Sequence, residues 1–275
     1  MSPPLEQAMI ALRSRRLEDA ARLANSVLRA DRGNLLAVEI LGTALLALDR
    51  PVDALVPLQR SAKRSGDPAI ETLAAKALLA SGRTQEALAQ LQLTTERRPP
   101  YPPAFLELGE ALAASGRFEE AADVLGQALN LMPTADGLRI ALGYVHLKRN
   151  DRGGARRAFQ HVRTAAPGRR DAMIAMAKLM ALEGQYADAA DLYRQALAKQ
   201  PDDPPSRISL GKCLLELDRR EEGEAVIRQA IQAAPQFAGL AVGALASASH
   251  GRFFLRPSAA LKFFERDAAA AALRP

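Results

Sequence analysis

The sequence has few of the residues that build disulfide-bonded, metal-centred or catalytic proteins. It has one cysteine, Cys213, so no intramolecular disulfide can form. Its three histidines, His146, His161 and His250, are isolated, and neither HExxH nor CxxC spacing occurs. A glycine-rich phosphate loop of the form GxxxxGK is also absent. The sequence therefore predicts no metal site, no cofactor and no enzymatic activity.

Long hydrophobic runs are missing as well. The longest, FAGLAVGALASA at 237–248, is shorter than the roughly 20 residues that span a bilayer. The opening stretch MSPPLEQAMIALRSRRLEDA has acids and prolines where a signal peptide needs an apolar core. Because 48% of the residues are hydrophobic, the chain can bury a substantial core. We expect a folded protein of a reducing cytoplasm, and the excess of arginine over lysine is typical of a GC-rich bacterial genome.

Prolines recur at a fixed interval along the chain. They occupy positions 99, 133, 167, 201 and 235, each 34 residues after the last. A small residue precedes each proline by twelve positions, as Ala87, Ala121, Ala155, Ala189 and Gly223. A bulky residue follows each small one by four positions, as Leu91, Leu125, Phe159, Tyr193 and Ile227. This register indicates a chain built from 34-residue repeats.

These columns resemble the tetratricopeptide repeat, which combines small, bulky and proline positions in this order. The best copy is PPAFLELGEALAASGRFEEAADVLGQALNLMPTA at 102–135. The resemblance implies an all-α, right-handed α-solenoid of helix hairpins, with 238–275 as a degenerate eighth hairpin or C-terminal cap. The seven units expected before the cap are approximately 1–34, 35–67, 68–101, 102–135, 136–169, 170–203 and 204–237.

Each unit is predicted to form two amphipathic helices joined by a short turn such as SGR or EGQ. The turn glycine is replaced by Asn150 in the fifth unit and by Asp218 in the seventh. Glycine inside a helix costs about 1 kcal/mol relative to alanine, so a glycine repeated there needs a compensating gain. At Gly109, Gly143 and Gly211 we expect that gain to be close contact with the neighbouring helix.

The stretch GRFFLRPSAALKFF at 251–264 holds four of the eight phenylalanines: Phe253, Phe254, Phe263 and Phe264. Gly251 to Phe253 repeats the turn of 116–118, and we expect Ser258 to cap the second helix of the last hairpin. One interpretation is a cap whose phenylalanines bury the last open face of the stack. The other leaves one or two of them exposed as a partner or homodimer surface, because adjacent helical residues point about 100° apart.

In this family, function usually lies on the inner face formed by the first helix of each unit. The inward positions predict a peptide-binding groove with an aliphatic row and a charged row. Its members are Lys76, Leu106, Glu110, Ile140, Tyr144, Ile174, Lys178, Ile208 and Lys212. Acidic groups of a partner would lie near Lys178 and Lys212. Alternatively, the aliphatic residues pack between helices and the lysines are solvated.

Positive charge is concentrated at 148–170, KRNDRGGARRAFQHVRTAAPGRR, which has eight basic residues against Asp151. Arg152, Arg156, Arg157 and Arg163 form the centre of this predicted basic patch on the convex side of the fifth unit. An acidic protein segment or a phosphate-rich surface could bind there, or the patch is simply solvated. Nucleic acid is the least favoured partner, since no stacking aromatics are interleaved with the arginines.

The resemblance implies a protein that binds a peptide or protein segment and does not catalyse a reaction. We expect an adaptor or assembly scaffold. Chaperone-binding members hold a C-terminal carboxylate with polar side chains, but Ile140, Tyr144 and Ala175 occupy places where such residues are needed. One alternative is a recognition or accessory subunit of a separate enzyme, such as a glycosyl- or sulfotransferase. Another is a structural protein that self-assembles through its phenylalanine-rich C-terminus.

Overall fold

The structure is a computed structural model that describes residues 3–254 and 256–271. Within these residues all regular secondary structure is helical, with sixteen α-helices and one 3-10 helix. Close contacts divide it into two compact units, Met1–Arg149 and Asn150–Pro275, called unit 1 and unit 2.

The helices follow one another with short connections. Unit 1 contains α1 (Pro3–Arg13), α2 (Leu17–Ala30), α3 (Leu35–Ala47), α4 (Pro51–Ser65), α5 (Pro68–Ala80), α6 (Thr84–Thr95), α7 (Pro102–Ala114), α8 (Phe118–Leu131) and α9 (Asp136–Lys148). Unit 2 contains α10 (Arg152–Ala165), α11 (Arg170–Leu182), α12 (Tyr186–Lys199), α13 (Pro204–Glu216), α14 (Arg220–Ala233), η1 (Pro235–Phe237), α15 (Ala238–Ser247) and α16 (Pro257–Ala271).

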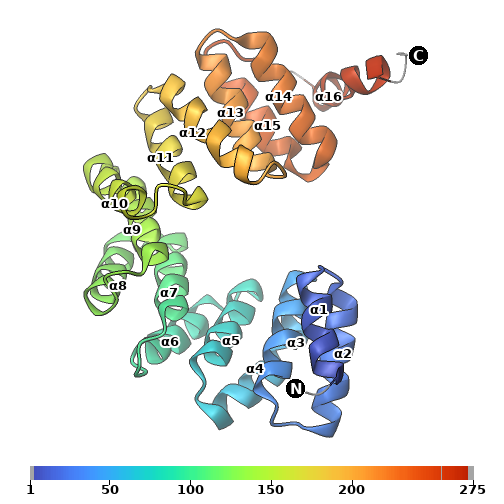
Figure 1. Ribbon diagram of the computed structural model, residues 1–275, viewed down its shortest axis with the longest axis vertical. Helices are drawn as coiled ribbons and strands as arrows, with labels where there is room; N and C mark the ends of the chain where they lie inside the picture. Colours follow the sequence, from blue (N-terminus) through green and yellow to red (C-terminus); the bar gives the residue numbers. More distant parts are fainter. Residues whose placement is uncertain (1–2, 255, 272–275) are drawn as a thin grey trace. The chain divides into compact units, whose positions relative to one another are not determined.

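Most consecutive helices pack against each other as hairpins, as Figure 1 shows along the colour sequence of each unit. In unit 1, α7 packs on α8 and α8 packs on α9. The alternate helices α3, α5, α7 and α9 also contact one another in turn, and together they form the face made by the first helices. The all-helical hairpin stack expected from the sequence is therefore confirmed, whereas the proposed repeat boundaries stay a prediction.

A recurrent turn joins the helices of a hairpin. The amide of Arg117 donates to the carbonyl of Leu112 over 2.9 Å, and Gly116 between them has φ of 77°. A left-handed residue after the last helical turn lets the chain reverse and satisfies carbonyls that the helix leaves open. Asn150 and Asp218 have φ of 58° and 60°, which confirms that they replace the turn glycine.

The helical glycines mark places where two helices approach closely. A Cβ atom on Gly109 of α7 would lie 2.8 Å from Cγ of Leu125 on α8. On Gly211 of α13 it would lie 2.5 Å from Ile227 and 2.9 Å from the carbonyl oxygen of Gly223 on α14. The close contact between helices that was expected to compensate for the low helix propensity of glycine is thus confirmed at Gly109 and Gly211. A larger residue at either position would force the two helices apart.

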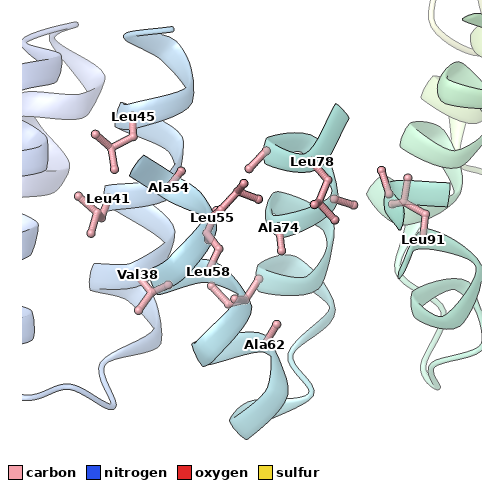
Figure 2. Close-up of a cluster of buried hydrophobic side chains, with 14 of the residues drawn as sticks. Val38, Leu41, Leu45, Ala54, Leu55, Leu58, Ala62, Ala74, Leu78 and Leu91 are labelled. Atoms are coloured by element: carbon pink, nitrogen blue, oxygen red, sulfur yellow. The ribbon is translucent and has the colours of Figure 1, made fainter. Parts of the chain in front are cut away.

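Each unit has its own hydrophobic core. In unit 1 the core runs along the stack, and Figure 2 shows a part in which α3, α4 and α5 contribute Val38, Leu58 and Ala74. In unit 2 a core joins α13 and α14 to the last two helices through Ile227, Leu245 and other apolar side chains. Each hairpin therefore covers an apolar face that its neighbour would otherwise expose.

The C-terminal helices α15 and α16 occupy the region expected for a last hairpin, but two details were wrong. The amide of Arg252 donates to the carbonyl of Leu245, seven residues back, whereas the turn at Arg117 spans five. Helix α16 begins at Pro257, and the carbonyl of Arg256 accepts from the amide of Ala260 at 3.4 Å. Ser258 therefore lies in the first turn of α16, and Arg256 takes the capping position because proline is well suited to the first helical residue.

Candidate functional site

The predicted groove residues Glu110 and Tyr144 meet in a cleft of about 480 Å³ in unit 1. We call it the α7/α9 cleft, because most of its lining comes from those two neighbouring first helices. Its lining side chains are Glu110, Ala113, Ala114, Phe118, Leu125, Ala141, Tyr144, Val145 and Lys148. Polar groups converging on an apolar surface are typical of ligand sites.

Helical spacing explains why these side chains share one cleft. Ala113 and Ala114 follow Glu110 by three and four residues on α7, and Lys148 follows Tyr144 by four on α9. Residues three or four apart lie on the same helix face. Short alanine side chains at 113 and 141 leave room between the helices, which are in contact. Lys148 and Phe118 were missed as groove residues, although the four-residue spacing from Tyr144 could have identified Lys148.

The polar groups of the α7/α9 cleft differ in charge and exposure. Glu110 and Lys148 are exposed, and Tyr144 is half-buried. Although much of the Glu110 side chain is exposed, neighbouring groups displace part of the water around its carboxyl, and this partial desolvation raises its pKa above the ordinary value of 4.5. The neighbouring Glu107 adds to the shift, and Lys76 opposes it. One end of the cleft thus carries a carboxylate that takes up a proton more readily than usual, and α9 supplies an ammonium group.

The other groove residues of unit 1 are more restricted. Nζ of Lys76 on α5 lies 2.6 Å from Oε1 of Glu107 on α7, so this lysine is engaged in an ion pair. Leu106 is half-buried. Ile140 is 6% exposed, and its assignment as an anchor on the groove surface is wrong. Its burial fits the alternative that the sequence left open, in which the aliphatic residues pack between helices.

Unit 2 holds the remaining predicted groove residues on α11 and α13. Ile174 and Lys212 are half-buried, and Lys178 is exposed. Ile208 is only 2% exposed and belongs to the core of this unit, so it too was wrongly expected at the surface. The aliphatic row therefore alternates in character, since Leu106 and Ile174 are accessible whereas Ile140 and Ile208 are not.

The predicted basic patch is partly neutralised by its own unit. Arg152 and Arg157 are exposed on α10, and Arg163 is half-buried. Arg156 forms an ion pair with Glu183, the residue that follows α11, which leaves less of its charge for a partner. Further along the basic stretch, Arg170 pairs with Asp203. Carboxylates distant in sequence thus reduce the charge available for an external ligand.

The C-terminal phenylalanines divide into two groups. Phe263 and Phe264 on α16 are each 5% exposed, so both members of this adjacent pair are buried, as the cap interpretation expects. Their rings contact each other in an edge-to-face arrangement with centroids 5.3 Å apart, and Phe254 packs 5.3 Å from Phe263. Phe253 is 72% exposed. Three rings are therefore engaged with the cap, and only Phe253 fits the proposed interface.

The single cysteine is buried, and His250 lies within hydrogen-bonding distance of the backbone. Cys213 on α13 is 2% exposed. Nδ1 of His250 lies 3.1 Å from the carbonyl oxygen of Leu215. Among residues 3–254 and 256–271, no three histidine, cysteine or acidic side chains are grouped as metal ligands. None of the helices in that part of the chain has the length and hydrophobicity needed to cross a membrane.

Comparison with known proteins relates most of the chain to one family. A sequence profile of the family described as tetratricopeptide repeat matches residues 78–136, 112–179 and 180–247. A second profile with the same description matches residues 5–70. No curated protein matches the chain significantly.

Several solved structures have a similar fold. The thermophilic TPR protein TTC0263 of Thermus thermophilus is 26% identical, with a TM-score of 0.57 over 65% of this chain and 97% of that one. A tetratricopeptide repeat protein from Parabacteroides merdae is 16% identical, with a TM-score of 0.65 over 84% of this chain and 92% of that one. A chain of the APC/C heterotetramer Cut9–Hcn1 is 13% identical, with a TM-score of 0.65 over 98% of this chain and 53% of that one.

Proposed function

Because this chain belongs to the tetratricopeptide repeat family, we propose that it is a non-catalytic scaffold that binds a peptide segment of a partner protein in the α7/α9 cleft. Repeats of this family generally mediate contacts between proteins. The observation that carries the proposal is the meeting of Glu110, Tyr144 and Lys148 around an apolar floor. Because Glu110 and Lys148 have opposite charges, they favour one orientation of the bound peptide chain over the reverse one.

The chemistry of the α7/α9 cleft defines the peptide. A basic side chain of the partner would pair with Glu110, and an acidic one with Lys148. Between them, an aliphatic or aromatic side chain would cover Ala113, Ala141 and Phe118. Tyr144 offers a rigid apolar ring with a hydroxyl group, a combination that is enriched at binding hot spots.

We extend the proposal to the first-helix face of unit 2. Ile174 of α11 and Lys212 of α13 are both half-accessible there and could contact an apolar and an acidic residue of a partner. We also place the protein in a bacterial cytoplasm, because a chain with a single buried cysteine has no structural need for an oxidising compartment.

The test begins with peptides selected from a random display library on the immobilised full-length chain. The affinity of a selected peptide is then measured for the wild type, Tyr144→Ala and Lys148→Glu. We expect each substitution to weaken binding by about tenfold or more, as loss of a central aromatic or charged contact does.

Two substitutions in unit 2 serve as controls. Tyr186→Ala removes a tyrosine of similar exposure from α12, and Lys199→Glu reverses an exposed charge at the end of the same helix. Both should bind the peptide as the wild type does, with unchanged circular dichroism. Equal affinity of Tyr144→Ala and Tyr186→Ala would show that the α7/α9 cleft is not the peptide site.

A further inference from the structure

A second cleft in unit 1 involves none of the residues singled out from the sequence. It has a volume of about 710 Å³ and lies between the second helices α2 and α4, over α3. Arg29 of α2 and Arg60 of α4 line its sides, and Leu41 of α3 lies at its floor. We call it the α2/α4 cleft. It is formed mainly by second helices and is separate from the α7/α9 cleft.

The α2/α4 cleft is strongly basic. Its charged lining residues are the acid Asp53 and five arginines, Arg29, Arg32, Arg50, Arg60 and Arg64. The carboxylate of Asp53 already accepts a hydrogen bond from Nε of Arg50 at 2.7 Å. Nη2 of Arg64 donates to the backbone carbonyl of Arg32 at 2.7 Å. The side chains of Arg29, Arg32 and Arg60 are exposed and have no ion-pair partner in the described part of the chain.

A buried hydroxyl group in the lining points independently to a ligand. Ser61 of α4 is 2% exposed and lines the α2/α4 cleft. Its Oγ has no hydrogen-bond partner among the described residues. Buried hydroxyl groups in proteins are nearly always hydrogen-bonded, because leaving one unpaired costs stability. A ligand that enters the cleft and hydrogen-bonds to Ser61 would remove that penalty.

The arrangement of the cations favours an extended ligand over a compact anion. Arg50 lies directly before α4, and Arg60 lies within α4, ten residues after Arg50. At the helical rise of 1.5 Å per residue, this separation corresponds to about 15 Å. The walls between them are apolar, with Val56 63% exposed and Leu28 half-buried. No aromatic side chain lines the cleft, so the stacking surface that single-stranded nucleic acids use is missing.

We propose that the α2/α4 cleft binds an acidic peptide segment in which carboxylates are interspersed with aliphatic residues. The carboxylates pair with Arg29, Arg32 and Arg60, whose guanidinium groups match carboxylates in shape and charge. An aliphatic side chain covers Val56, and Ser61 donates a hydrogen bond to the segment. The protein would then engage its partners on two separate faces of unit 1.

The probe is a fluorescent peptide of alternating glutamate and leucine, and its affinity for the full-length protein is measured by fluorescence anisotropy. We expect Arg60→Glu to weaken binding by about tenfold or more. The substitution removes a hydrogen bond between Arg60 and a carboxylate of the peptide, and hydrogen bonds between charged groups are stronger than those between neutral groups. The matched control is Lys63→Glu, which reverses an exposed charge on the same helix outside the cleft and should bind as the wild type does.

Ser61→Ala separates a binding role from a structural one. Removal of a hydroxyl group without a partner should leave the melting temperature unchanged or raise it, whereas affinity for the peptide should fall about fivefold. Equal affinity of Arg60→Glu and Lys63→Glu would overturn the proposal. So would equal binding of a glutamine–leucine peptide, tighter binding of a single-stranded oligonucleotide, displacement of the peptide by inorganic phosphate alone, or no binding of the acidic peptide by the wild type.

Discussion

Cys213 shows how completely some reactive side chains are enclosed. It is 2% exposed on α13. Burial raises the pKa of its thiol to about 11, although the nearby Lys212 opposes the shift. A thiol reacts as the thiolate, so burial lowers both the access of a reagent and the reactive fraction at neutral pH.

We predict that Cys213 does not react with an aromatic disulfide reagent in the native protein at pH 7, and reacts fully in denaturant. At a pKa of about 11, roughly one thiol in 10,000 is ionised at pH 7. The measurement is the absorbance of the released thiolate over time. Reaction of the native protein at the rate of the unfolded chain would contradict the enclosed position.

At the scale of helices, two glycines test what holds a hairpin together. Gly109 and Gly126 lie in α7 and α8, the two helices of one hairpin. A Cβ atom on Gly109 would lie 2.8 Å from Cγ of Leu125, a side chain that is fully buried. A Cβ atom on Gly126 would meet nothing within 4 Å. The same substitution should therefore have opposite effects at the two positions.

We predict that Gly109→Ala lowers the free energy of unfolding by about 1–3 kcal/mol, because overpacking outweighs the better helix propensity of alanine. Gly126→Ala should raise it by about 0.5–1 kcal/mol, since only the propensity gain acts there. Urea unfolding followed by circular dichroism measures both values. Stabilisation by both substitutions would show that close packing of α7 on α8 is not required.

At the scale of the whole molecule, a stack of repeats needs its ends covered, and a buried charge cluster helps to hold the C-terminal cap. Glu224 of α14 is 7% exposed. It accepts hydrogen bonds at 3.1 Å from Nε of Arg220 and from Nε of Arg252, which precedes α16. The guanidinium of Arg252 also lies 5.2 Å from the ring centre of Phe263. One carboxylate thus connects α14 to Arg252, which lies between the two helices of the cap, α15 and α16.

The cluster gives the cap a pH dependence. Burial by itself would raise the pKa of Glu224, but the hydrogen bonds from Arg252 and Arg220 outweigh it, and the pKa lies below the ordinary 4.5. A carboxyl with a lowered pKa in the folded state stabilises the fold above the unfolded-state pKa. That contribution is lost as the pH falls through the folded-state value.

We predict that Glu224→Gln unfolds at a lower temperature than the wild type at pH 7, and that the difference shrinks as the pH falls below about 4.5. Thermal melts from pH 7 to 3 measure it. Glu222→Gln is the control, because Glu222 forms an exposed ion pair with Arg219 on the same helix, and such pairs contribute little. A constant difference across this range would exclude ionised Glu224 as the source.

The fold class and the positions of close helix contact could be inferred from the amino-acid sequence alone. The spacing of small, bulky and proline residues is local information, and a helix repeats its face every three or four residues whatever surrounds it. Gly109, Gly211, Asn150 and Asp218 could be assigned for that reason. Glu110 and Tyr144 hold the same position in successive repeats, and both line the α7/α9 cleft.

Which of these side chains reach the surface, and which charges are already paired, became clear from the packing of the helices. Ile140 and Ile208 share a register with Leu106 and Ile174, yet they are buried. Arg156 forms an ion pair with Glu183, which belongs to a different hairpin. The basic α2/α4 cleft is formed where α2 and α4 lie on either side of α3. Exposure and pairing depend on the side chains that a neighbouring hairpin places opposite, and the spacing within one repeat does not specify them.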